Sequence, residues 1–351
     1  MKSKKYPVAL LINDVHLNKD NGDLVKDIFQ QAIKICKEKS ISTIILGGDV
    51  FTNRSGQPLI CLTIWLEILS MIADAHLMLV VIPGNHDKTD ANSENSYLDV
   101  FRYHPNIRVV SKHEIIRYNG DLIIGLIPYF GDERWLEEFK ELELKVGRAD
   151  HHILITHMGV EGVRNNDGTE VVSVIKPKTF KNWDKVLVGH YHNASKVGDN
   201  IYYTGSAYQN DFGENIVDKG ATIIYSDASL KFIPFDFPKH IKEVLYVTDT
   251  ESLRNVIEKY SDGNEMYDNI RLVFRGKKVD LKKVDTAELQ RLGFEVTFES
   301  TESVEAVELA ECEEIISMDK KSIFKDFLKF CSENDIKGKH LQYGMKLMKT
   351  L

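Results

Sequence analysis

The chain has 351 residues, of which 43% are hydrophobic and 28% charged, with a formal net charge of -8 at pH 7. This length suits a globular protein with one large core and one or two small modules. The acidic balance argues against a free-standing nucleic-acid binder, unless bound divalent cations or a basic partner reverse the local field. The four cysteines are scattered without CxxC spacing and indicate reduced thiols: Cys36, Cys61, Cys312 and Cys331. Because Asn13 and Asp14 break the first apolar run, we expect a cytoplasmic chain without signal peptide or membrane span.

Short apolar runs that end in Asp, Asn or His recur between residues 8 and 192. They are residues 8–16 (VALLINDVH), 41–49 (ISTIILGGD), 79–87 (LVVIPGNHD), 152–157 (HILITH) and 186–192 (VLVGHYH). Each predicts a buried strand. Residues 23–39 and 58–75 carry apolar side chains at helical spacing and predict crossover helices. The order β-α-β-α-β is therefore predicted within the first ninety residues.

The middle of the chain predicts a second sheet. An Asn119-Gly120 pair between two apolar runs is typical of a hairpin. A helix is predicted over 135–146, and short strands over 201–204, 221–225 and 231–235. We therefore expect an α/β fold in which residues 1–237 form a two-sheet sandwich flanked by helices.

Two prolines, Pro234 and Pro238, indicate a domain boundary. Residues 238–298 predict a small α+β accessory module without His or Cys at its strand ends, and the acidic stretch 299–318 predicts a solvated linker. Residues 319–351 alternate apolar and basic side chains at helical spacing, which predicts a C-terminal helical tail of two helices. An apolar helix pair tethered in this way favours docking to helices of another protein. The alternative is that the tail folds back on the accessory module.

The predicted strand ends carry the chemistry. In an open α/β sheet the carboxyl ends of the strands line one crevice, which would collect Asp14, His16, Asp49, Asn85, His86, His157, His190 and His192. Imidazole, carboxylate and amide ligands without thiolate suit manganese, iron or zinc, and Mn²⁺ is our first choice. Eight such side chains are too many for one ion, so we expect two divalent ions about 3.5–4 Å apart, with Asp49 as the bridge. Such a pair activates a water for in-line attack, and the predicted reaction is hydrolysis of a phosphate ester.

The motifs Asp14-x-His16, Gly48-Asp49, Gly84-Asn85-His86-Asp87, His157 and Gly189-His190-Tyr191-His192 resemble those of the calcineurin-like metallophosphoesterases. Within that superfamily the chain is similar to the nuclease subunits of SbcCD-type DNA repair complexes, the meiotic recombination 11 family, and their T-even phage counterparts. The resemblance implies that Asp14, His16, Asp49 and His192 hold one metal. It implies that Asp49, Asn85, His157 and His190 hold the other, and that His86 acts on the scissile phosphate or its leaving oxygen.

The resemblance also implies a two-metal DNA nuclease, an exonuclease and endonuclease that serves DNA repair, recombination or replication in a bacterial or phage-infected cell. Its partners would be DNA and an SMC-like coiled-coil ATPase that binds residues 319–351, with a homodimer of the nuclease inside a heterotetramer. The alternative is a phosphoesterase that acts on a small phosphodiester or a phosphoprotein through the same site.

Some site residues keep more than one interpretation. Asp87 either orients His86 or a neighbouring ligand without binding metal itself, or caps the following turn. Tyr208 and Phe212 are possible DNA contacts that would stack on bases, or else packing residues. Cellular relatives often have a His where Thr52 stands here, so the resemblance assigns no role in positioning DNA ends to that position.

Overall fold

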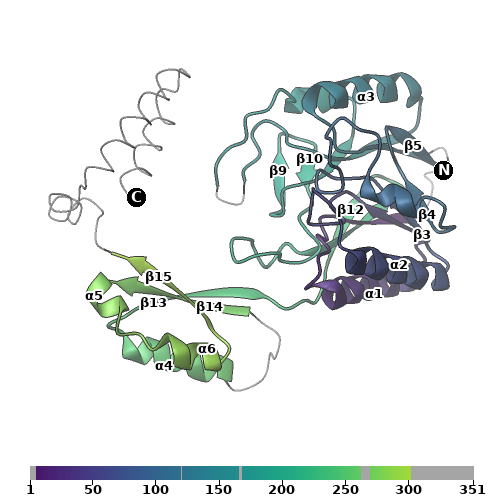
Figure 1. The fold of residues 1–351 in the computed structure, drawn as a ribbon. Coiled ribbons are helices and arrows are strands. Elements are labelled where there is room, and N and C mark those ends of the chain that lie inside the picture. The colour runs from purple at the N-terminus through teal and green to yellow at the C-terminus, as the bar shows by residue number, and fades with distance from the viewer. Residues whose placement is uncertain (1–4, 120, 166–167, 262–268, 302–351) are drawn as a thin grey trace, which may run out of the picture. The chain divides into compact units, whose positions relative to one another are not determined.

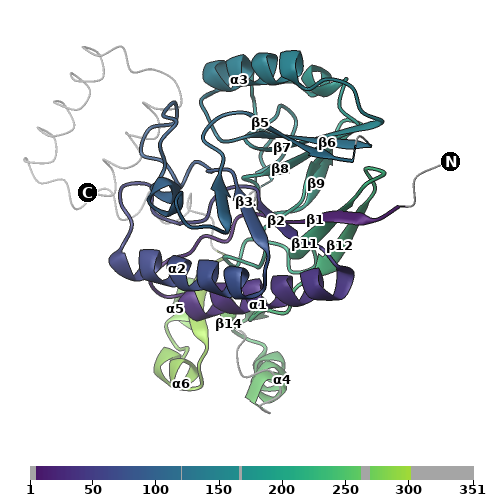
Figure 2. The same ribbon diagram turned by 90° about the vertical axis from the view of Figure 1, so that its right-hand side faces the viewer.

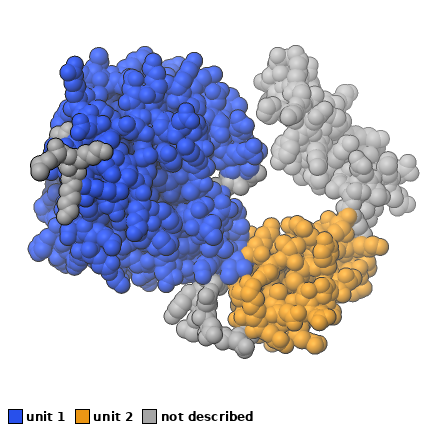
Figure 3. Space-filling view, turned by 180° about the vertical axis from the view of Figure 1, so that it is seen from behind, with its two compact units in different colours: residues 1–241, 265–269 blue, residues 242–264, 270–351 orange. Residues whose placement is uncertain are grey.

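A computed structural model describes residues 5–119, 121–165, 168–261 and 269–301. Two compact units share these residues, and Figure 3 colours them separately. The first runs to Ile241 and includes Asn269, so it ends a few residues beyond the expected boundary at 237. The second begins at Lys242.

The first unit contains two six-stranded sheets. One has the order β12-β11-β1-β2-β3-β4, with bounds β1 Pro7–Ile12, β2 Thr43–Leu46, β3 Met78–Val81, β4 Ile107–Val109, β11 Gly220–Tyr225 and β12 Leu230–Pro234. The other has the order β5-β6-β7-β8-β10-β9, with bounds β5 Glu114–Tyr118, β6 Leu122–Ile127, β7 His151–His157, β8 Lys185–Gly189, β9 Ser195–Val197 and β10 Ile201–Tyr203. Both sheets are mixed, and β5 and β6 form the expected antiparallel hairpin.

Helices cover the outer faces of both sheets (Figures 1 and 2). They are α1 Gly22–Lys39, α2 Leu59–Asp74 and α3 Asp132–Lys145, with the short 3₁₀ helices η1 Tyr97–Phe101 and η2 Pro177–Phe180. α1 and α2 lie together against the first sheet, and α3 lies against the second. The fold is therefore an α/β sandwich of helix, sheet, sheet and helix layers, as the sequence predicts.

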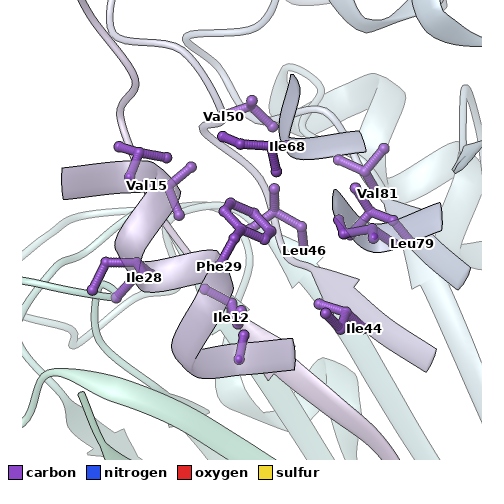
Figure 4. Close-up of a cluster of buried hydrophobic side chains, with 14 of the residues drawn as sticks. Ile12, Val15, Ile28, Phe29, Ile44, Leu46, Val50, Ile68, Leu79 and Val81 are labelled. Carbon is purple, nitrogen blue, oxygen red and sulfur yellow. The ribbon is translucent and has the colours of Figure 1, made fainter. Parts of the chain in front are cut away.

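Strand alternation accounts for these layers. In β1, Leu10 and Ile12 face the helices, whereas Ala9 and Leu11 face the second sheet. Figure 4 shows the helix-facing cluster, in which Phe29 of α1 packs beside Leu46 of β2. Neighbouring strands are buried on both faces and therefore read as continuous apolar runs in the sequence.

Parallel pairing aligns the carboxyl ends of the predicted strands with one another. Leu46 of β2 pairs with Ile12 of β1 and with Val81 of β3. In the other sheet, His157 at the end of β7 pairs with Gly189 at the end of β8. The polar residues that follow each strand therefore leave the two sheets at one edge of the sandwich.

The second unit is a three-stranded sheet with the order β13-β14-β15, and short helices connect its strands. Its elements are β13 His240–Tyr246, α4 Thr250–Ser261, β14 Asn269–Gly276, α5 Lys278–Leu281, α6 Thr286–Arg291 and β15 Glu295–Ser300. The elements follow a β-α-β-α-β order, with α5 and α6 together forming the second crossover. Glu299 lies in β15 and pairs with Arg275 at 2.6 Å, so the prediction that the linker begins at residue 299 is wrong.

The rest of the predicted linker and the predicted tail over 319–351 lie outside the described residues. Among the helices that are described, none is both long and apolar enough to cross a membrane.

Candidate metal centre

The predicted ligands stand on loops that leave the strands at one edge of the sandwich. Asp14 and His16 follow β1, Asp49 follows β2, and Asn85 follows β3. His157 is the last residue of β7, and His190 and His192 follow β8. The structure brings all seven predicted metal ligands together, in overlapping groups whose donor atoms lie within 4.8 Å of one another or hydrogen-bond to the group.

Four of these residues have a left-handed backbone. Their φ angles are 54° at Asp14, 43° at His16, 53° at Asp49 and 92° at His190. Such angles are uncommon for residues other than glycine and cost of order 1–3 kcal/mol each. The surrounding structure holds this strain at the positions where the side chains must turn back toward one another, which is typical of a functional site.

Two glycines allow the loops to approach. Gly48 has a φ of +108°, and a Cβ there would lie 2.2 Å from Nδ1 of His157. A Cβ on Gly84 would lie 2.1 Å from Oδ1 of Asp49. The glycines that precede the Asp in one motif and the Asn in the other are therefore needed for close packing of the ligands.

One group of ligands consists of Asp14, His16 and His192. Nε2 of His16 lies 3.0 Å from Nε2 of His192. The backbone N–H of His190 donates to Oδ1 of Asp14 over 3.0 Å, which fixes that carboxylate. Two imidazole nitrogens that face each other beside a carboxylate form a donor set suited to a divalent ion.

The second group consists of Asp49, His157 and His190. Oδ1 of Asn85 lies 3.0 Å from Nε2 of His157 and 2.8 Å from Nδ1 of His190. An amide oxygen is thus directed at two imidazoles, as in a ligand set of nitrogen and oxygen donors.

Asp49 lies between the two groups. Its Oδ2 is 3.3 Å from Nε2 of His157 and 3.6 Å from Nε2 of His16. Its Oδ1 accepts a hydrogen bond from the backbone N–H of His86 over 2.8 Å. This position between ligands of both groups is the one expected of a bridging carboxylate.

Burial dominates the electrostatics of the site. It lowers the pKa of His16 and of His190 to about 3, and it raises the pKa of Asp14 to about 6. Burial also opposes the charges on Asp49 and His157, but their mutual attraction prevails. The pKa of Asp49 falls below its ordinary value, and the pKa of His157 rises to about 9. Without metal, the proton on His157 balances the Asp49 carboxylate, and a bound cation would replace that proton.

His86 stands beside these ligands. Its Nδ1 lies 2.5 Å from the backbone oxygen of Thr52, and its Nε2 lies 3.2 Å from Nη2 of Arg54. Donor atoms of His86, His16 and Asp49 also lie within 4.8 Å of one another. The Thr52 hydroxyl donates to the backbone oxygen of His16 over 2.6 Å, so the residue that replaces the family's His supports both histidines.

Arg54 is a functional candidate that the sequence analysis missed. It is exposed and follows β2 by a loop, a setting without a strong sequence signal. The only available signal was its place five residues after the bridging Asp49.

Asp87 connects two of the ligand loops. Its carboxylate accepts backbone N–H groups of Gly84 over 2.8 Å, Phe51 over 3.0 Å and Val50 over 3.2 Å. Burial raises the pKa of Asp87 to about 7, while these N–H donors favour its anion. Asp87 thus holds the Asp49 loop against the Asn85 loop.

A buried ion pair lies behind His192. Oε1 of Glu214 is 2.6 Å from Nδ1 of His192, and Oε2 of Glu214 is 2.6 Å from Nζ of Lys219. Burial would raise the pKa of Glu214, but His192 and Lys219 lower it to about 2. The sequence alone gives no sign of this role for Glu214, because only the fold brings it to His192.

A pocket of about 750 Å³ opens over the site and is lined by residues that include His16, Asp49, His86, His190 and His192. Among its described lining residues none is Lys or Arg. Tyr208 borders this pocket but is 2% exposed, and its hydroxyl hydrogen-bonds to Asn21 and to the backbone oxygen of Val15. Tyr208 is therefore a packing residue in this structure, because stacking on a base would require its ring to leave the core. Phe212 is half-buried with its ring against His240.

The two-layered sheet core and the clustered donors define a metal-dependent hydrolase. The sequence profile of the calcineurin-like phosphoesterases matches residues 8–194, and the chain belongs to this family.

Three relatives illustrate the range of similar proteins. The chain is 22% identical over 306 residues to a putative phosphoesterase, 078R, of invertebrate iridescent virus 3, covering 85% of each chain. It is 25% identical to exonuclease subunit 1 of Enterobacteria phage T4, over 64% of this chain and 67% of that one. It is 26% identical to the DNA double-strand break repair protein Mre11 of Saccharolobus solfataricus, over 52% of this chain and 49% of that one.

The donor set of this chain fits the two-metal centre that the family implies. His192 donates through Nδ1 to a carboxylate, which leaves its Nε2 lone pair directed at the imidazole of His16. Two nitrogen lone pairs and the carboxylates of Asp14 and Asp49 converge where only a cation would be stabilised.

Proposed function

We propose that the chain is a DNA nuclease that hydrolyses phosphodiester bonds with two divalent ions, and that these ions are Mn²⁺ in preference to iron or zinc. The observation that carries the proposal is the position of Asp49 between the two ligand groups, with His86 and Arg54 beside it. The names of two relatives, an exonuclease subunit and a double-strand break repair protein, support DNA as the substrate.

Bound divalent ions would polarise phosphate oxygens and supply an activated water for in-line attack. The residues of the chain would do the rest. Asp14, His16, Asp49 and His192 would hold one ion, and Asp49, Asn85, His157 and His190 the other. The backbone oxygen of Thr52 engages Nδ1 of His86, so Nε2 of His86, which lies 3.2 Å from Nη2 of Arg54, is the nitrogen that would act on the phosphate or the leaving oxygen. Arg54, beside that nitrogen, would bind a non-bridging phosphate oxygen.

The direct test is incubation of the purified chain with labelled linear and circular DNA, in Mn²⁺ and in EDTA, beside a generic phosphodiester. We expect manganese-dependent degradation of linear DNA and nicking or cleavage of circles. Hydrolysis of the generic diester without cleavage of either DNA would reject the nuclease.

Hydrolysis of the generic diester without cleavage of DNA would favour the other candidate, a phosphoesterase for a small diester or a phosphoprotein. The relative from invertebrate iridescent virus 3, which matches 85% of the chain, supports this candidate, because it is named only as a phosphoesterase.

We further propose that the chain works as the nuclease subunit of a complex with an SMC-like coiled-coil ATPase, in DNA repair, recombination or replication in the cytoplasm. Residues 319–351 would dock on the ATPase, and two copies of the nuclease would assemble in a heterotetramer. The phage T4 relative is named as an exonuclease subunit, which supports an assembly with other chains. A basic partner would also supply the positive surface that a chain of net charge -8 lacks.

A further inference from the structure

The loop between β10 and β11 delivers a buried carboxylate to one ligand group. The side chain of Glu214 is 0% exposed, and its Oε1 lies 2.6 Å from Nδ1 of His192. Its Oε2 accepts hydrogen bonds from the backbone N–H of Asn210 over 3.1 Å and from the Ser206 hydroxyl over 3.3 Å. These contacts fix the carboxylate, so it determines which nitrogen of His192 carries the proton.

Lys219 allows this carboxylate to stay ionised away from water. Its ammonium is 0% exposed and donates to Oε2 of Glu214 over 2.6 Å, to the Ser206 hydroxyl over 2.8 Å and to the backbone oxygen of His192 over 2.7 Å. All three ammonium hydrogens therefore have acceptors, as a buried charge requires. Through Lys219 the ion pair holds the backbone of His192, and through Glu214 it holds the imidazole.

The other ligand group has a weaker support. Nδ1 of His157 lies 2.9 Å from the backbone oxygen of Gly47, a neutral acceptor. A carboxylate behind an imidazole makes the ligand nitrogen more basic than a peptide oxygen does, and such partners are worth about 10–100-fold in metal affinity. The two ligand groups therefore differ in the acceptor behind one of their histidines, which is a carboxylate for His192 and a peptide oxygen for His157.

We propose that the Glu214–Lys219 pair positions His192 as an Nε2 ligand and strengthens the metal position of Asp14, His16 and His192, while the position of Asp49, Asn85, His157 and His190 does not depend on it. The two positions then fill unequally as metal concentration rises, and Glu214 and Lys219 act as positioning residues. This inference rests on the two-metal centre of the proposed function and not on its substrate.

Titration of Mn²⁺ into the metal-free full chain, followed by calorimetry and by the electron paramagnetic resonance signal of free Mn²⁺, tests the proposal without any substrate. We expect two ions per wild-type chain. In Glu214→Gln we expect the dissociation constant of one ion to rise about 10–100-fold and that of the other to stay unchanged. Anomalous diffraction at the manganese edge should show reduced occupancy beside Asp14, His16 and His192.

Glu138 provides a matched control. It is also a buried carboxylate, with Oε2 2.5 Å from Nδ1 of His113 and Oε1 2.6 Å from Nη2 of Arg134, but it lies on α3 away from the ligand loops. Glu138→Gln should therefore leave both dissociation constants unchanged.

Because Glu214→Gln leaves Lys219 buried without its counter-ion, a second variant guards against unfolding. Glu214→Gln combined with Lys219→Met removes both charges, a replacement that proteins often tolerate. It should keep a melting temperature close to that of the wild type in EDTA and show the same loss at one position. Wild-type affinity at both positions in this double variant, or an equal loss at both positions, would overturn the proposal.

Discussion

The guanidinium of Arg54 lies 3.2 Å from Nε2 of His86 at the edge of the metal centre. The loop that carries Arg54 is held in place, because the Tyr97 hydroxyl donates to the backbone oxygen of Arg54 over 2.9 Å. No ion pair of Arg54 occurs within the described ranges, so its charge is available to a ligand. A cation beside the proposed catalytic histidine is placed to bind an anionic phosphate.

Arg54→Ala should weaken binding of inorganic phosphate to the Mn²⁺-loaded chain and raise KM for a generic phosphodiester. A hydrogen bond to a charged group is worth about 1.5–3 kcal/mol, so we expect a change of roughly 10–150-fold. Calorimetry with phosphate measures the binding, and steady-state kinetics measures KM.

Arg117→Ala is the matched control for Arg54. Arg117 is exposed on β5 and pairs with Ile123 near the start of β6, at the end of the second sheet opposite to His157. It should bind phosphate like the wild type. Unchanged phosphate affinity in Arg54→Ala would reject the assigned contact.

His86→Ala should reduce hydrolysis by about 10²–10⁴-fold and leave both metal positions filled, because seven other side chains supply the ligands. Activity assays together with Mn²⁺ titration measure the two effects separately. His151→Ala serves as the control, since His151 stands at the start of β7 with its side chain 37% exposed. Loss of one ion from His86→Ala would instead identify His86 as a ligand, in keeping with its place near His16 and Asp49.

Asp49→Ala should lose metal as well as activity, because its carboxylate lies between donors of both groups. We expect Mn²⁺ affinity to fall at both positions, as measured by calorimetry. Asp227→Ala removes an exposed carboxylate that pairs with Lys5 and should have no such effect. Two ions bound with wild-type affinity in Asp49→Ala would contradict the bridge.

Local sequence was sufficient to place the strand ends and most of the site. Strands buried on both faces, such as β1, β2 and β3, give apolar runs that stop at Asp14, Asp49 and Asn85. Parallel pairing then brings these ends together by geometry alone.

Contacts between distant segments could not be predicted in this way. Glu214 reaches His192 across 22 positions of sequence, and Arg54 reaches His86 across 32. Neither pairing has a periodic signal, because each depends on how a loop folds over the sheet edge. The burial of Tyr208 could not be predicted from the sequence either, since an aromatic residue in a loop has the same local pattern whether it packs in the core or faces a ligand.

Lys88 predicts a pH dependence of stability. Its ammonium is buried, donates to the backbone oxygens of Tyr129 over 2.7 Å and Ser93 over 3.0 Å, and lies over the Phe130 ring. Burial lowers the pKa of Lys88 to about 8, from an ordinary 10.5. Between these values the unfolded chain binds the proton and the folded chain does not, so the contribution of Lys88 to stability rises with pH.

Lys88→Met should therefore flatten the rise in the free energy of unfolding between pH 8 and 10.5. Urea unfolding in EDTA at several pH values measures this slope. Lys26→Met, which removes a half-buried lysine paired with Asp23 and Glu67, should keep a slope close to that of the wild type. An identical slope in wild type and Lys88→Met would show that the ammonium is not the source.

Deletion of residues 319–351 tests the proposed partner. The apolar positions of this segment, with basic residues between them, follow an acidic stretch in the sequence, which favours a docking element over a part of the core. The shortened chain retains every proposed metal ligand, so we expect it to keep manganese-dependent cleavage of short DNA and to lose co-purification with the ATPase. Charge reversal at Lys320 and Lys321 within the full chain is a milder variant and should weaken the association without removing it. Unchanged affinity of the shortened chain for the ATPase would show that docking uses another surface, and loss of DNA cleavage would show that the segment supports the core.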